Sequence, residues 1–82
     1  MLVKHTLAMT ALCPVDGKQD AYTVMVECNR IIKVEDILAA CARFQQEALF
    51  QEQITQELSH ILDAKVTTTG LHSGVATVCA CS

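Results

Sequence analysis

The spacing of apolar residues changes twice along the chain, and this change constrains the fold more than any other feature. Residues 2–12 and 21–28 alternate between apolar and polar side chains, with Val24 and Val26 on the apolar side of the second run. Alternation of this kind is typical of strands with one buried face. Because only residues 13–20 separate the two runs, we expect an antiparallel pair.

From Glu35 onward the apolar residues follow a helical period instead. Two sets each share one helical face: Ile37, Leu38, Cys41 and Phe44, then Phe50, Ile54, Leu58 and Ile61. The change of face predicts two helices with a boundary near residues 46–49. Residues 65–69 and 75–79 are rich in β-branched side chains, and the segment 70–74 between them contains two glycines, which predicts a hairpin.

The expected order of elements is therefore strand, strand, helix, helix, strand, strand. Such a chain is predicted to have an α+β fold of the ββααββ type, in which a four-stranded antiparallel sheet carries two helices on one face. The 82 residues are expected to form one domain, 1–82, which buries only about 60–65% of the surface of its unfolded chain. Half of the residues are apolar, which is more than one small core can bury. We therefore expect other copies of the chain to cover the remaining apolar surface in a homo-oligomer.

Such an oligomer is also expected from the two open edges of the sheet. Edge strands present unpaired N–H and C=O groups, which pair readily with another chain. Closing several sheets into a barrel would create clefts between subunits, where ligand sites are often found.

Charge and hydropathy exclude several classes of partner. The net charge is −3 and the six Lys and Arg residues are scattered among acids, so we expect no nucleic acid partner. The apolar stretches are far shorter than the ~20 residues of a membrane helix, and residues 1–5 lack the pattern of a signal peptide. We therefore expect no membrane partner and a cytoplasmic location. Five cysteines, with no pair at a two-residue gap, favour reduced thiols.

The turn between the first two strands holds two candidate catalytic residues. Cys13 lies next to Pro14, where a partly exposed thiol can act as a nucleophile, although a small apolar filler at a strand end is the commoner role. Asp20 could move protons if the loop folds back, or it could simply bond to its own backbone.

Three further residues are candidates on the second half of the chain and on the first helix. Glu52 is expected at the boundary of the core, where a carboxylate can accept paired hydrogen bonds from a heterocycle; otherwise it is a solvated charge. His72 could be a proton shuttle or metal ligand, or an ordinary turn histidine. Glu35 fits the acidic first turn of a helix. No compact set of three zinc ligands is evident, so zinc is not expected.

Together these features resemble the tunnelling-fold (T-fold) superfamily, and within it the 7-cyano-7-deazaguanine reductases, the nitrile reductases of queuosine biosynthesis. The shared passages are Leu12-Cys13-Pro14 through Gly17 to Asp20, Val34-Glu35, Phe44 and Phe50-Gln51-Glu52. The resemblance runs from about residue 10 to residue 76. It implies the T-fold, assembly into an oligomeric barrel, and a purine-like substrate bound between subunits.

The resemblance also implies roles for individual residues. Cys13 would add to a nitrile carbon to give a thioimide, Asp20 would handle protons, and Glu52 would anchor the deazapurine. Glu35 and Gln51 occupy positions that the family uses near the substrate, so we expect both to be substrate-binding, and we expect His72 to relay protons. In Gln51 this chain departs from the family's histidine.

The departures bear on the cofactor and on the alternatives. The family holds NADPH with Ser and Lys residues after its first-helix glutamate, whereas Asp36-Ile37-Leu38 follow Glu35 here, so NADPH use is doubtful. Residues 51–55 and His72 are also similar to GTP cyclohydrolase I, but Asp16 and Gly74 stand where that enzyme has two of its three zinc ligands. A cyclohydrolase-like metal-dependent hydrolase and a non-catalytic T-fold binding module remain as alternative functions.

Overall fold

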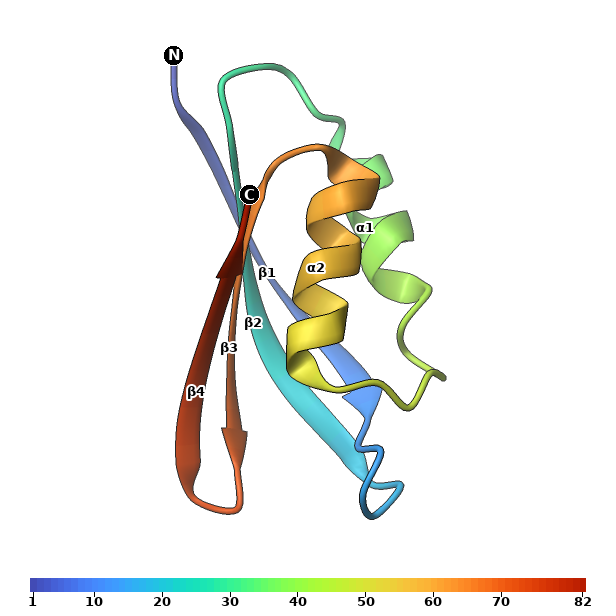
Figure 1. Ribbon diagram of the computed structural model, residues 1–82. Coiled ribbons are helices and arrows are strands. Elements are labelled where there is room, and N and C mark those ends of the chain that lie inside the picture. Colours follow the sequence, from blue (N-terminus) through green and yellow to red (C-terminus); the bar gives the residue numbers. More distant parts are fainter.

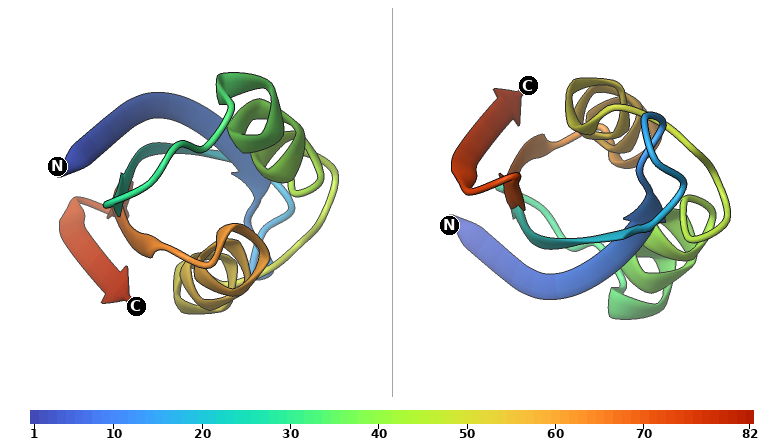
Figure 2. Two further views of the ribbon diagram at one scale, coloured as in Figure 1. Left: turned by 90° about the horizontal axis from the view of Figure 1, so that it is seen from above. Right: turned by 90° about the horizontal axis from the view of Figure 1, so that it is seen from below.

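The computed structural model describes all 82 residues, and its elements follow the predicted order (Figure 1). They are β1 (Val3–Leu12), β2 (Gln19–Cys28), α1 (Val34–Ala42), α2 (Gln51–Leu62), β3 (Lys65–His72) and β4 (Val75–Cys81). The strands form one antiparallel sheet in the order β1-β2-β3-β4. Both helices lie on one face of this curved sheet, as the two end-on views show (Figure 2). The predicted α+β class and ββααββ order are confirmed.

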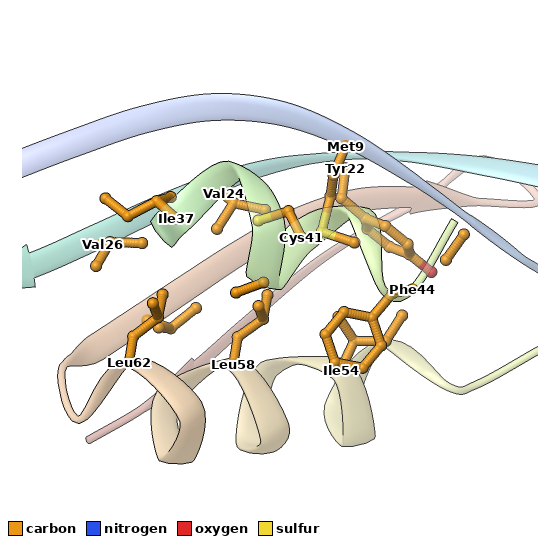
Figure 3. Close-up of a cluster of buried hydrophobic side chains, with 13 residues drawn as sticks. Met9, Tyr22, Val24, Val26, Ile37, Cys41, Phe44, Ile54, Leu58 and Leu62 are labelled. Carbon is orange, nitrogen blue, oxygen red and sulfur yellow. The ribbon is translucent and has the colours of Figure 1, made fainter. Parts of the chain in front are cut away.

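The core lies between the sheet and the two helices (Figure 3). Every second residue in the middle of β2 points into it, which explains why Val24 and Val26 are fully buried. From α1 the core receives Ile37 and Cys41, and Phe44 from the segment after α1 is also fully buried. Removal of this apolar surface from water is what holds the helical layer against the sheet.

The start and end of α2 differ from the sequence prediction. Phe50 precedes the helix as its N-cap residue and is 54% exposed, so it is not part of the buried helical face. At the other end Leu62 is buried, whereas Ile61 is 40% exposed. The buried face thus continues from Leu58 by a step of four to Leu62, one position beyond the predicted Ile61.

The hairpin between β3 and β4 is tighter than predicted. The strands extend to His72 and from Val75, so only Ser73 and Gly74 form the turn, with φ of 49° and 83°. Positive φ at both central residues is the geometry that matches the twist of the flanking strands. As a result, His72 lies at the end of a strand with a defined orientation.

The outer strands of the sheet are β1 and β4, and apart from the bridge of Leu12 with Ala48 their outer edges pair with no other strand of the chain. The predicted oligomeric barrel stays a prediction. All five cysteines are free. Neither helix is long and apolar enough to cross a membrane.

Candidate functional site

The β1–β2 turn, the β3–β4 turn and the start of α2 lie toward the same end of the molecule (Figure 1). A cleft of about 340 Å³ opens between them. We call it the hairpin cleft. Its walls are residues 13–16 of the β1–β2 turn, Asp20 and Tyr22 of β2, residues 49–52 around the start of α2, and His72, Ser73 and Thr77 of the β3–β4 hairpin. Segments far apart in the sequence therefore contribute to one concave surface.

Backbone contacts bring Cys13 to the start of α2. The preceding residue, Leu12, donates its N–H to Glu47 O at 3.1 Å and forms a bridge with Ala48. Cys13 itself donates its N–H to Lys18 O at 2.7 Å, and its C=O accepts from the N–H of Gly17 at 2.9 Å. The loop before α2 is thereby tied to the end of β1, and the half-buried Cys13 thiol lines the cleft.

Asp16 lies in the same turn as Cys13 and was not among the predicted site residues. Its Oδ1 accepts a hydrogen bond from the backbone N–H of Lys18 at 2.9 Å. This bond, with a smaller effect of the nearby Cys13 thiol, lowers the pKa of the Asp16 carboxyl below its ordinary value. The nucleophile candidate thus has a carboxylate as its neighbour within its own turn.

His72 and Asp20 face each other across the β2 and β3 strand ends. His72 Nδ1 lies 3.7 Å from Asp20 Oδ2, and His72 Nε2 lies 2.8 Å from Gln51 Oε1. The Tyr22 hydroxyl donates to the same Asp20 oxygen at 3.4 Å, and the Tyr22 and His72 ring centroids are 5.8 Å apart. The imidazole is therefore held between an amide oxygen on one side and a carboxylate on the other.

Tyr22 is a second residue that the sequence reasoning missed. Its ring is packed against Gly70, its cross-strand partner, so closely that a Cβ at position 70 would lie 2.6 Å from the ring. Burial, with a smaller effect of the nearby Asp20 charge, raises the pKa of Tyr22 to about 12. The alternation of β2 could have revealed it, because Tyr22 lies two residues from Asp20 and hence on the same face.

Gln51 is the most buried polar residue of the cleft, with 2% of its surface exposed. Its Nε2 contacts three acceptors, which are Thr68 O at 3.1 Å, Thr68 Oγ1 at 3.0 Å and Thr77 O at 3.0 Å. Thr55 Oγ1 donates to Gln51 O at 2.8 Å and lies 2.7 Å from Thr68 Oγ1. A buried polar network of this kind keeps a single arrangement, because each unpaired group would be costly.

Five of the six predicted site residues line the hairpin cleft: Cys13, Asp20, Gln51, Glu52 and His72. The exception is Glu35, which lies exposed in the first turn of α1 and lines no part of this cleft. Glu52 is exposed rather than at the boundary of the core, because the helix begins only at Gln51. Their catalytic and binding roles stay predictions.

The hairpin cleft is lined mainly by acidic side chains. Asp16, Asp20 and Glu52 line it, no Lys or Arg does, and His72 is its one basic side chain. No group of three or more His, Cys, Asp or Glu side chains is placed to hold a metal ion. A concave surface with several carboxylates, a thiol and an exposed aromatic residue, Phe50, can accept N–H donors from a flat ring and stack against it.

The order of the strands and the layer of two helices agree with the fold that the sequence resemblance implied. The solved apo structure of an archaeosine synthase, QueF-like, has this fold, with a TM-score of 0.87 over 98% of this chain and 90% of that chain. The two sequences are 18% identical, so the likeness shows a shared fold. The sequence matches no protein-family model and no curated protein.

Proposed function

We propose that this protein is a T-fold enzyme that binds a purine- or pterin-like heterocycle in the hairpin cleft and attacks it with Cys13. The observation that carries the proposal is the meeting of Cys13, Asp20 and Glu52 in one cleft, although 39 residues separate the first from the last. A nucleophile, a proton-transfer group and a ring-binding carboxylate are the parts that such a reaction needs.

The walls of the cleft suggest how the ligand is held. Glu52 is exposed in the first turn of α2, where its carboxylate can accept two N–H bonds from an aminopyrimidinone edge. Phe50 lies beside it and offers an exposed ring for stacking. Because the chain lines this cleft with carboxylates and no Lys or Arg, a neutral ring fits it better than a nucleoside triphosphate.

The proposed chemistry is the addition of the Cys13 sulfur to an electrophilic carbon, such as that of a nitrile. The Cys13 thiol gives its proton to Asp20 or His72, and the S–C bond forms as one π bond of the C≡N group breaks. The same group then returns the proton to the nitrogen, which leaves a thioimide. The electron pair on sulfur ends in the new S–C bond, and no redox step is involved up to this point.

NADPH, which the resemblance implied as a hydride donor, does not fit the residues at the start of α1. The first turn carries Glu35 and Asp36, and the nearest cation is Lys33 at the N-cap. An acidic turn repels the phosphates that a dinucleotide would place there. We therefore propose the thioimide as the covalent step and derive no reduction from it.

The acidic turn of α1 also favours a second candidate, a non-catalytic module that binds the heterocycle without transforming it. A cyclohydrolase-like metal-dependent hydrolase has less support, because Asp16 and Gly74 stand in place of two zinc ligands. Elemental analysis of protein purified without chelator tests that third function: about one zinc per chain would favour the hydrolase.

Intact-mass spectrometry with 7-cyano-7-deazaguanine tests the proposed function. We expect one covalent adduct per chain in the wild type and in Cys81→Ala, and none in Cys13→Ala. Cys81 is a suitable control, since it is also a half-buried thiol but lies outside the cleft. A thermal-shift increase without any adduct would favour the binding module, and neither response would contradict both functions.

A further inference from the structure

Gln51 holds a side-chain amide whose orientation the structure determines. Its Nε2 faces two backbone carbonyls, Thr68 O and Thr77 O, and a carbonyl oxygen can only accept hydrogen bonds. The amide must therefore present its NH₂ group to the sheet. Its Oε1 consequently points at His72 Nε2, 2.8 Å away.

The threonine pair supports the same orientation independently. Thr55 has one hydroxyl proton, which it donates to Gln51 O at 2.8 Å. In the 2.7 Å contact between the two hydroxyls, Thr68 must then be the donor. Since the only hydroxyl proton of Thr68 is used there, its Oγ1 can only accept from Gln51 Nε2. Two separate chains of donors and acceptors thus place the amide in one way.

We propose that Gln51 is a positioning residue that holds neutral His72 in the tautomer with its proton on Nε2, so that Nδ1 is the nitrogen that takes up and returns protons in the hairpin cleft. The amide oxygen accepts only, hence the 2.8 Å contact requires a proton on Nε2. Nδ1 then carries the free lone pair, on the side of Asp20 and the cleft.

The groups around His72 Nδ1 are compatible with reversible proton transfer to this nitrogen. Asp20 Oδ2 lies 3.7 Å away, too far for a direct hydrogen bond but close enough to stabilise an imidazolium. The other ionisable groups around the cleft are Glu52 on α2, Tyr22 on β2, and Cys13 and Asp16 on the turn, and none of them carries a positive charge. A proton moved to Nδ1 from a ligand or from the Cys13 thiol would leave His72 paired with Asp20.

The inference concerns the same cleft as the proposed function and rests on that function only for its catalytic consequence. The tautomer itself is a property of the ligand-free protein. A ¹⁵N NMR experiment on the ligand-free chain at about pH 8.5, some two units above the ordinary histidine pKa of ~6.5, measures it directly. His72→Gln assigns the His72 signals among those of the three histidines.

In the wild type we expect a protonated Nε2, an unprotonated Nδ1, and an Nε2 proton protected from exchange with water. In Gln51→Met, which keeps the length of the side chain and removes its oxygen, we expect that proton to exchange at least about tenfold faster, the factor for a hydrogen bond worth ~1.4 kcal/mol. A wild-type neutral His72 with its proton on Nδ1 would overturn the inference without any variant.

Two control variants separate positioning from general stability. Thr55→Val breaks the buried network but leaves the Gln51–His72 contact, so we expect lower stability with unchanged protection of the Nε2 proton. Gln56→Met makes the same substitution at an exposed position of α2 and should change neither. Equal loss of protection in Gln51→Met and Thr55→Val would show a merely structural role and overturn the inference.

The adduct assay keeps this inference distinct from the proposed function. If 7-cyano-7-deazaguanine forms no adduct, the proposed function fails. The NMR experiment on the ligand-free chain still decides whether the inferred tautomer is correct. If the adduct forms and the tautomer is as inferred, we expect Gln51→Met to change the pH dependence of adduct formation and Thr55→Val to leave it unchanged. An unchanged pH profile in Gln51→Met would remove the catalytic consequence.

Discussion

The two ends of α2 use polar side chains in opposite ways. At the C-terminal end, Arg30 donates from its two terminal nitrogens to the carbonyls of Leu62 and Asp63, and Ser59 donates to Ala64 O at 2.7 Å. These bonds satisfy the carbonyls of the last helical residue, of the C-cap residue Asp63 and of Ala64, which follows the helix. This end has the residues of a stable helix terminus.

At the N-terminal end, by contrast, the polar side chains bond both to backbone groups and to one another. Gln51 connects the two threonines of the buried network to His72, and His72 faces Asp20. The result is an ordered set of side chains along the wall of the hairpin cleft. The comparison teaches that side chains at one end bond to the backbone alone, whereas side chains at the other end also fix one another's orientation.

The largest effect on stability is expected from Gly70→Ala, which lies near the N-terminal end of α2. The new Cβ would lie 2.6 Å from the Tyr22 ring and 3.3 Å from Gln51 Oε1, so the buried ring must shift. We expect a loss of about 1–3 kcal/mol in the free energy of unfolding, measured by urea denaturation. Leu71→Ala, at an exposed neighbour on the same strand, should stay within about 0.5 kcal/mol. A Gly70→Ala protein as stable as the wild type would contradict the close packing of the cleft wall.

The next largest effect on stability is expected from raising the pH, and it also arises near the N-terminal end of α2, at Tyr22. Folding raises the pKa of Tyr22 from an ordinary 10.0 to about 12, because the buried phenol loses its solvation. The unfolded chain therefore releases this proton first, so the stability that the neutral phenol contributes is complete below pH 10 and is lost as pH rises toward 12. At ~1.4 kcal/mol per pH unit the loss is on the order of 2 kcal/mol, because water partly solvates the hydroxyl at the cleft.

This titration has a clean measurement and a clean control. Tyr22 is the only tyrosine and the chain has no tryptophan, so the ultraviolet absorbance of the phenolate reports on it alone. Denaturation as a function of pH should show the loss in the wild type, and Tyr22→Phe should show less of it. A phenolate that forms near pH 10 in the folded chain would contradict the burial of this ring at the cleft.

Some of these features could be predicted from the sequence and others could not, depending on the kind of contact. The alternation of β1 and β2 and the helical period after Glu35 predicted the fold, because burial of one face imposes a period on the sequence. The sequence also indicated Cys13 and His72 as residues of turns or strand ends. The network of Gln51 with two threonines leaves no such period, since it depends on the register of β3 against α2.

Two predicted details failed for related reasons. Glu52 was expected at the boundary of the core, and Phe50 inside a helix, yet the helix begins one residue after Phe50 and leaves both exposed. No proline or glycine, and no Ser, Thr, Asp or Asn at the N-cap, marks that start in the sequence. Instead, the side-chain Oε1 of Gln53 accepts the N–H of Phe50 at 3.0 Å, and the contact of Leu12 with Glu47 holds the preceding loop.

The smallest effect is expected from Arg30→Ala, at the opposite end of α2. The variant loses two hydrogen bonds to the last carbonyls of the helix and a positive charge at its negative end. Because part of this contact faces water, we expect a loss of about 1–2 kcal/mol in the free energy of unfolding by urea denaturation. Arg30→Lys should lose less, since it keeps the charge but cannot reach both carbonyls with one planar group.

In neither variant should the NMR signature of His72 change, because no bond connects Arg30 to the Gln51 network. A shift of the His72 tautomer in Arg30→Ala would show instead that the two ends of the helix are coupled, and the separation between the two ends would fail.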